Sequence, residues 1–341
     1  KLELQGTGMN SAALGAKIFL RADGQTFYQE QMPMRGFQSS MDARPNFGLG
    51  GVAKVDTLIV VWPTGNKITL LTDVPTDQIL RLKQSEANNA VINMPWLKPD
   101  QAPVIEPVAD NAGIRWKHEE SRFFDWDRDR MLYFQYSTEG PRTAVEDANG
   151  DGRADVFICG AAGQAGVLLL QKADGSFRES PQPAFQADAA SEDTDAVFLD
   201  ADGDGDNDLY VASGSNEAEP LSTALGDRLY LNNGKGQFLR KSDAVPGEKP
   251  FASGCVITAD WDGDGDMDLF VGMRLLPGKI GVPVGGYLLQ NDGSGYFSTL
   301  QPEALKNLGM ITDAVWADVD NDKDPDLLIV GEWMAPKYFR N

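Results

Sequence analysis

Four short acidic stretches have the residue types and the spacing to bind a metal ion. They lie at residues 147–155, 200–208, 260–268 and 318–326 and are called loops 1 to 4 below. Each loop places an oxygen-bearing side chain at positions one, three, five and nine, and each lies between two apolar segments. A hard cation such as Ca²⁺ binds about six to eight oxygens at roughly 2.4 Å, and alternate side chains of a tight turn can point at one ion. The loops therefore predict up to four Ca²⁺ sites.

The predicted side-chain ligands are the residues at those four positions of each loop. They are Asp147, Asn149, Asp151 and Asp155 in loop 1; Asp200, Asp202, Asp204 and Asp208 in loop 2; Asp260, Asp262, Asp264 and Asp268 in loop 3; and Asp318, Asp320, Asp322 and Asp326 in loop 4. Carboxylates about 4 Å apart repel by ~1 kcal/mol in water and by ~4 kcal/mol at an effective dielectric near 20. Loop 2 packs five carboxylates into nine residues, so a bound cation would hold it compact.

Two other interpretations of the loops fit less well. An EF-hand begins in the same way but requires a bidentate Glu at position twelve, where this chain has Ile158, Val211, Val271 and Ile329. Acidic turns that only keep a surface soluble would not be expected four times in one register. Loops 1 to 3 have Gly at positions four and six, where the turn requires positive φ. Loop 4 has Asn321 and Lys323 there, so it is the least favourable site.

The composition excludes several kinds of partner. The 341-residue chain has a net charge of −21, which argues against nucleic acid and anionic membranes. It has no apolar run of the roughly eighteen residues that a membrane span needs, so no direct insertion is expected.

Its two cysteines, Cys159 and Cys255, lie in apolar strand segments and are predicted to be buried free thiols. The absence of an initial Met suggests a mature or excised piece. Millimolar calcium indicates a secreted or cell-surface location, and the few cysteines favour a bacterial surface protein.

The chain divides into three segments. Residues 1–87 contain alternating apolar segments separated by turn residues, which predict a small β-sandwich or barrel. Residues 88–107 carry Pro95, Pro99, Pro103 and Pro107 at regular spacing and are predicted to form a semi-rigid linker. Residues 108–341 contain the loops at intervals of 53, 60 and 58 residues. A glycine-rich hairpin turn recurs between them, as in Gly175-Ser-Phe177 and Gly293-Ser-Gly-Tyr-Phe297. About four strands per such period is the pattern of a β-propeller blade.

Two family resemblances support this division. The first segment resembles the ASPIC and UnbV domain, known from the cartilage acidic protein family and bacterial surface proteins, with Thr64 where that family usually has Ser. The resemblance rests on Gly6-Thr7, Asn10, Gly15-Ala-Lys17, Gly36-Phe-Gln-Ser39, Asn46-Phe-Gly-Leu-Gly50, Val55-Asp56 and Val61-Trp-Pro-Thr-Gly65. It implies a β domain beside a propeller and no catalytic residue; Trp62 and Phe47 are expected in the core.

The repeats resemble the FG-GAP or VCBS repeats of integrin α-chain propellers. This resemblance implies that position seven of each loop contributes its backbone carbonyl to the ion. The residues concerned are Arg153, Asp206, Asp266 and Asp324. Residues 143–341 hold about three and a half blades, so an incomplete propeller with open sheet edges is expected rather than a closed ring. Open edges favour pairing with a second copy of the chain.

Residues 111–136 are the hardest segment to interpret. His118, the only histidine, is expected to be structural rather than catalytic. The aromatic and acidic run at 123–127 is expected to form an edge strand that anchors the propeller, with stacking on a sugar as the alternative.

The sequence favours a calcium-stabilised binding or adhesion module for a glycan or an extracellular protein. It contains no nucleophile motif, no zinc-type His/Cys cluster and no phosphate-binding loop, so we predict neither catalytic nor other cofactor-binding residues. The alternatives are a calcium-dependent polysaccharide lyase or hydrolase on a propeller scaffold, and a purely architectural domain of a longer adhesin.

Overall fold

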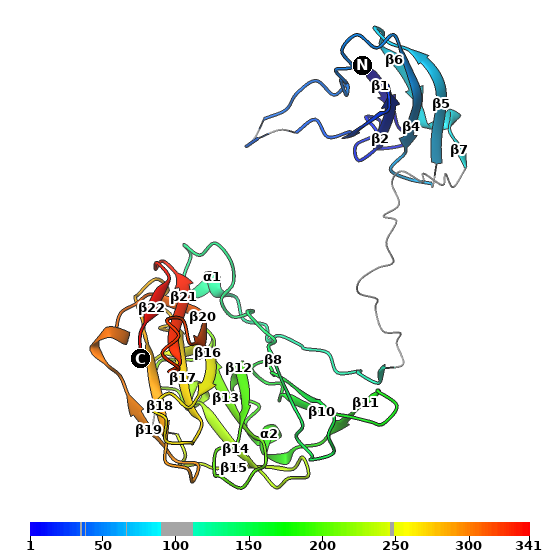
Figure 1. Cartoon of the computed structure of the whole chain (residues 1–341). Helices are drawn as coiled ribbons and strands as arrows, with labels where there is room; N and C mark the ends of the chain where they lie inside the picture. Colours follow the sequence, from blue (N-terminus) through cyan, green and yellow to red (C-terminus); the bar gives the residue numbers. More distant parts are fainter. Residues whose placement is uncertain (35, 38, 66, 90–111, 246–248) are drawn as a thin grey trace. The chain divides into compact units, whose positions relative to one another are not determined.

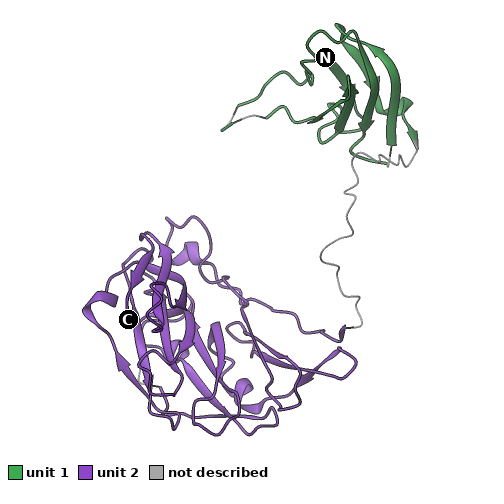
Figure 2. Cartoon of the chain, viewed as in Figure 1, with its two compact units in different colours: residues 1–106 green, residues 107–341 purple. Residues whose placement is uncertain are grey.

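The computed structural model describes residues 1–34, 36–37, 39–65, 67–89, 112–245 and 249–341. The chain forms two compact units, Lys1–Glu106 and Pro107–Asn341 (Figure 2). Of the predicted linker at 88–107, residues 90–107 lie outside the described residues. Asn88 and Asn89 form a short strand that pairs with the sheet of the first unit.

The first unit is built on an antiparallel five-stranded sheet. Its order is β3-β2-β4-β5-β7, and strands β1 and β6 form a separate parallel pair. The strands are β1 (Leu2–Gln5), β2 (Lys17–Ala22), β3 (Gln25–Glu30), β4 (Lys54–Val61), β5 (Lys67–Pro75), β6 (Leu80–Lys83) and β7 (Asn88–Asn89). Alternate residues of β2 enter the core, as expected for a strand buried on one face. Neither sheet closes into a barrel within the described residues.

The predicted core residues of the first unit are confirmed. Trp62 is buried, and its indole N–H donates to Thr69 Oγ1 at 2.9 Å. Phe47 is partly buried and packs against the same core as Trp62. These two aromatic residues therefore serve packing.

The second unit contains four antiparallel sheets in chain order. The first three have four strands each and the last has three. They are β8 (Thr143–Glu146), β9 (Asp155–Ile158), β10 (Val167–Gln171) and β11 (Phe177–Ser180); β12 (Glu192–Leu199), β13 (Asp208–Gly214), β14 (Arg228–Asn232) and β15 (Phe238–Arg240); β16 (Ala252–Ala259), β17 (Asp268–Leu275), β18 (Gly286–Asn291) and β19 (Phe297–Leu300); and β20 (Met310–Ala317), β21 (Asp326–Glu332) and β22 (Lys337–Phe339). Short helices α2 (Pro183–Ala187), η4 (Thr223–Leu225) and η5 (Glu303–Leu305) lie in connections between strands, and η1 (Gln84–Glu86) belongs to the first unit.

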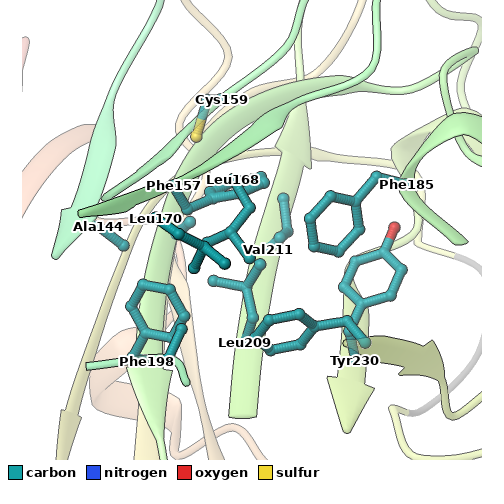
Figure 3. Packing of buried hydrophobic residues seen from close by; sticks show 13 residues of the cluster. Ala144, Phe157, Cys159, Leu168, Leu170, Phe185, Phe198, Leu209, Val211 and Tyr230 are labelled. Carbon is teal, nitrogen blue, oxygen red and sulfur yellow. The ribbon is translucent and has the colours of Figure 1, made fainter. Parts of the chain in front are cut away.

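The four sheets are arranged as propeller blades. The first strands β8, β12, β16 and β20 contact one another in chain order, and the sheets fan outward from them (Figure 1). Each gap between neighbouring sheets is filled by its own apolar cluster. Between the first two sheets, Phe157 and Leu168 face Val211 and Tyr230, and Phe185 of α2 closes one side (Figure 3). Cys159 and Cys255 are buried free thiols, as predicted.

The blade array is incomplete, as the loop spacing predicts. Among the residues that the structure describes, the last sheet has three strands, and β22 forms its edge. No backbone pairing joins the first sheet to the last within the described residues. The all-β fold with propeller-like blades is thus confirmed.

Residues 112–142, called the connecting segment below, run from the first sheet to the last and return to β8. Near its start, the backbone of Lys117 and Glu119 bonds to Gln164 of the first sheet's β9–β10 connection. Near its end, Tyr136 donates to Glu332 of β21 at 3.0 Å. The segment therefore ties together sheets that share no strand pairing.

The expectation of an edge strand at residues 123–127 is wrong. Asp125–Arg128 forms a one-turn helix, α1. The buried Asp125 carboxylate accepts hydrogen bonds from Ser137 and from the Asn216 side chain, and Trp126 donates to the Leu132 carbonyl. These bonds satisfy the polar groups within a compact turn, so no pairing with a sheet is needed.

Candidate calcium loops and their surroundings

Each acidic loop joins the first and second strands of a sheet. Loop 1 follows β8, loop 2 follows β12, loop 3 follows β16 and loop 4 follows β20. The Asp at position nine is in every case the first residue of the next strand. The four loops therefore occupy equivalent places in the blades.

The Asp at position one holds the turn by accepting backbone hydrogen bonds. Asp200 accepts from the N–H groups of Gly203 at 2.9 Å and Gly205 at 3.0 Å, and Asp260 accepts from the equivalent glycines of loop 3. The residues at positions four and six have positive φ in all four loops, as predicted. In loop 4 this requires φ of 63° at Asn321 and 83° at Lys323, a conformation that costs a lysine side chain more than glycine.

The Asp at position nine connects the loop to the third strand. One carboxylate oxygen of each accepts a backbone N–H from that strand or from just beyond it, at 2.7 to 3.0 Å. The pairs are Asp155 with Gln171, Asp208 with Asn232, Asp268 with Asn291, and Asp326 with Asn341. Burial raises the pKa of Asp208 to about 7 and that of Asp268 to about 6. A nearby cation would offset the cost of keeping these buried carboxylates charged.

Three of the four loops bring carboxylates together closely enough to hold one ion. Ligand oxygens lie within 4.8 Å of one another in three trios. These are Asp200, Asp202 and Asp204; Asp260, Asp262 and Asp268; and Asp318, Asp320 and Asp326. In loops 2 and 3, Asp202 Oδ1 and Asp268 Oδ2 are buried acceptors with no hydrogen-bond partner among the described residues. Acidic oxygens of this kind suit Ca²⁺, so the donor set fits the predicted ion.

Arginine side chains contact carboxylates of loops 1 and 4. Arg153 pairs with Asp151 in loop 1, where Asn149 already replaces one carboxylate, and the carboxylates of this loop do not form such a trio. Arg340 contacts Asp320 at 2.7 Å and Asp322 at 2.9 Å in loop 4. The sequence indicates only loop 4 as a less favourable site. In the structure, loop 1 is also less favourable, because it contains an arginine and no converging trio of carboxylates. The position-seven side chains of Asp206, Asp266 and Asp324 are outside the converging trios.

An asparagine at the end of the third strand, or just beyond it, links each of the last three sheets to the loop of the preceding sheet, and the sequence had not been used to predict it. Its side-chain amide donates to the carbonyl of the residue at loop position two. The pairs are Asn232 with Ala148 at 2.8 Å, Asn291 with Ala201 at 2.9 Å, and Asn341 with Trp261 at 2.6 Å. The recurrence of Asn at the end of the apolar segment that follows loops 2 and 3, and again near the end of the chain after loop 4, was the available signal. The loops therefore lie at the junctions between blades.

The hairpin glycines fit against the same loops. A Cβ atom at Gly234 would collide with the Asp206 carboxylate, and one at Gly293 would collide with Asp266. Both glycines also have positive φ, at 69° and 72°. Glycine is thus favoured in this recurring turn by its positive φ, and its small size suits the close approach to the acidic loop.

Comparison with known families supports both units. Residues 6–89 match the family described as ASPIC and UnbV. Residues 147–211 and 200–271 match the family described as FG-GAP-like repeat, a range that contains loops 1 to 3. The order of the two families along the chain is the one that the sequence predicts.

Similarity beyond these family matches is limited. A crystal structure of the V. cholerae biofilm matrix protein Bap1 aligns with 17% identity and a TM-score of 0.27, over 59% of this chain and 30% of that one. A structure of an Agrocybe aegerita lectin that recognises non-reducing terminal N-acetylglucosamine aligns with 13% identity and a TM-score of 0.26, over 96% of this chain and 90% of the lectin. No curated protein sequence matches the chain significantly. Neither structural likeness assigns a ligand to this chain.

The helices found in the described parts of the chain are too short or too polar to cross a membrane.

Proposed function

We propose that this chain is a calcium-stabilised extracellular binding module, on a bacterial surface or secreted, and that it is not an enzyme. The convergence of three carboxylates in loops 2, 3 and 4 is the observation on which the calcium part rests. Loops 2 and 3 lie at the junctions between sheets, where the Asn291 and Asn341 side chains also bind. Bound Ca²⁺ would thus stabilise the packing of blades against each other. The FG-GAP-like match supports the extracellular setting.

The surface that we assign to ligand binding is a set of exposed aromatic side chains near the last sheet. Tyr133 is 88% exposed on the connecting segment, and Trp333, which follows β21, is 65% exposed. Phe134 stacks on Tyr136, whose hydroxyl bonds to Glu332 beside Trp333, so these residues belong to one region. Exposed Tyr and Trp rings offer an apolar face together with a hydrogen-bonding edge. A glycan has apolar ring faces and hydroxyl groups that match both, so we favour a glycan over a protein ligand.

A glycan array probed in millimolar calcium tests this assignment. The wild-type chain should bind a defined class of glycan, and Tyr133→Ala and Trp333→Ala should each weaken binding at least tenfold. Leu239→Ala is the matched control, because Leu239 is 75% exposed on β15 in the second sheet. No binding to any glycan, or equal binding by all variants, would argue against the aromatic surface.

The same samples test the enzyme alternative. Incubation with acidic polysaccharides should give no unsaturated product and no new reducing ends. Cleavage by the wild-type chain would replace the binding proposal with a lyase or hydrolase.

A further inference from the structure

A second group of metal-ligating side chains lies outside the acidic loops. His118 and Glu120 on the connecting segment meet Glu192, the first residue of β12, with one ligand atom from each within 4.8 Å of the others. His118 Nε2 lies 2.9 Å from Glu120 Oε1. The group combines an imidazole with two carboxylates, a different donor set from that of the loops.

Hydrogen bonds to the backbone of the residues before and after His118 hold the histidine in place. The Gln164 side chain donates to the Lys117 carbonyl at 2.8 Å and accepts from the Glu119 N–H at 2.8 Å. The Trp116 ring packs edge-on against the imidazole, with ring centroids 5.8 Å apart. Preorganised ligands of this kind lower the cost of binding an ion.

Glu192 enters the group from a buried position. It is 5% exposed, and its Oε2 accepts the Ala162 N–H at 2.5 Å. Gly140 lies between the group and a neighbouring cavity of about 140 Å³, since a Cβ atom there would contact the His118 ring and approach Glu192 Oε1. Glu192 and Gly140 both line that cavity.

Within the described part of the chain, the carboxylates of this group have no Lys or Arg partner to balance their charge. In contrast, the buried carboxylates Asp193 and Asp227 of the same unit pair with Arg228 and Lys249, respectively. Among the described residues, Glu120 has only His118 as an ion-pair partner, and Glu192 has no Lys or Arg partner. Glu217 lies close enough for its charge to disfavour ionisation of Glu192. Buried carboxylates without a countercharge are costly.

Two polar atoms of the group are also unsatisfied. His118 Nδ1 and Glu120 Oε2 are buried and have no hydrogen-bond partner among the described residues. Leaving such an atom unpaired is unfavourable. A ligand that draws on the imidazole and the free carboxylate oxygen would remove part of this cost.

We propose that His118, Glu120 and Glu192 form a binding site for a divalent transition-metal ion, with Zn²⁺ as the representative. Ca²⁺ and Mg²⁺ prefer oxygen ligands, whereas zinc binds imidazole nitrogen at ~2.0–2.1 Å and carboxylate oxygen at ~2.0–2.2 Å. Three protein ligands leave a fourth position for water or for a group of a bound partner. The site joins the connecting segment to β12 of the second sheet, so the ion would fix this crossing.

A proton is the competing occupant. Burial, together with the charges of Glu120 and Glu217, raises the pKa of Glu192 to about 8. A neutral Glu192 and a His118–Glu120 hydrogen bond would then make up the group without metal.

The single histidine of the chain allows a direct test. The full chain is labelled with ¹⁵N-histidine and titrated with Zn²⁺ in millimolar calcium, which keeps the acidic loops occupied. One equivalent of Zn²⁺ should shift the His118 ring nitrogen resonances to those of a metal-bound imidazole. Co²⁺ in place of Zn²⁺ should give visible d–d absorption bands. Ring resonances that do not respond to one equivalent of Zn²⁺ would overturn the proposal.

Matched variants assign the carboxylate ligands. Glu120→Gln and Glu192→Gln should each lower the Zn²⁺ affinity by about tenfold to a hundredfold or more, measured in competition with a chromophoric chelator. Loss of even an outer-shell partner of a metal ligand lowers the affinity by about that factor. Glu303→Gln is the control, since the Glu303 side chain is 86% exposed on η5. Near-UV circular dichroism checks the fold, and the partly exposed Glu120 keeps the test valid if the buried Glu192 variant unfolds. Equal Zn²⁺ affinity in Glu120→Gln and the control would contradict the assignment.

Discussion

Individual residues determine which acidic loops are best suited to calcium. All four loops share the same acidic positions and the same turn, but loops 1 and 4 already contain a guanidinium group. A bound arginine and a bound Ca²⁺ compete for the same carboxylate oxygens. We therefore expect loops 2 and 3 to bind calcium more tightly than loops 1 and 4.

Removal of the arginine from loop 4 should strengthen its calcium site. Arg340→Gln is expected to raise the affinity of loop 4 roughly three- to tenfold, because Asp320 and Asp322 lose a competing positive charge. Calcium titration against a chromophoric chelator measures the change. Arg178→Gln, an exposed position on β11 in the first sheet, is the control. An affinity for loop 4 that is the same in both variants would show that Arg340 leaves the loop when calcium binds.

At the scale of elements, the repeated contact between a third strand and the preceding loop sets how neighbouring sheets pack. Asn291 is 4% exposed and donates to the Ala201 carbonyl of loop 2 at 2.9 Å and to the Met267 carbonyl at 3.3 Å. Its backbone N–H independently binds Asp268. One asparagine therefore joins two loops and two sheets.

Replacement of this asparagine should destabilise the second unit. Asn291→Leu keeps the side-chain size and the backbone bond but leaves the buried Ala201 carbonyl and the partly buried Met267 carbonyl without that donor. The free energy of unfolding should therefore fall by about 1–3 kcal/mol. Denaturant unfolding in saturating calcium measures the loss. Asn341→Leu removes the equivalent bond at an exposed position and should cost less than half as much. Equal losses in the two variants would mean that burial does not govern this contact.

At the scale of the whole molecule, the chain contains one unit with acidic loops and one without. The loops and the FG-GAP-like match belong to residues 107–341, whereas the ASPIC and UnbV match lies within residues 1–106. Each unit has its own apolar core. Calcium should therefore act on only one of two unfolding events.

Calorimetry of the full chain tests this division. We expect two transitions, of which only the larger moves upward with calcium and downward with chelator. An ion at a hundred times its dissociation constant adds ~2.7 kcal/mol per site, which corresponds to roughly 5 °C or more in a unit of this size. A shift of both transitions by the same amount would mean that the units do not unfold separately, and no shift would exclude calcium binding to the folded loops.

Features that depend on residues close together in the chain could be predicted from the sequence alone. The strand–loop–strand repeat, the positive φ at loop positions four and six, and the incomplete fourth sheet could all be predicted from spacing and residue type. These features are local, because a nine-residue turn and the two strands beside it form from contiguous residues. The prediction of a strand at residues 123–127 was wrong because the helix found there depends on hydrogen bonds from the distant residues Ser137 and Asn216.

Contacts between side chains that are distant in the sequence could be seen only in the folded structure. Arg340 enters loop 4 because β22 pairs with β21, and Asn291 reaches loop 2 because neighbouring sheets pack face to face. His118 and Glu192 are separated by more than seventy residues and come together because the connecting segment passes the start of β12. No sequence period relates His118 to Glu192. Their contacts follow from chain packing, which is why the histidine site could be recognised only in the folded structure.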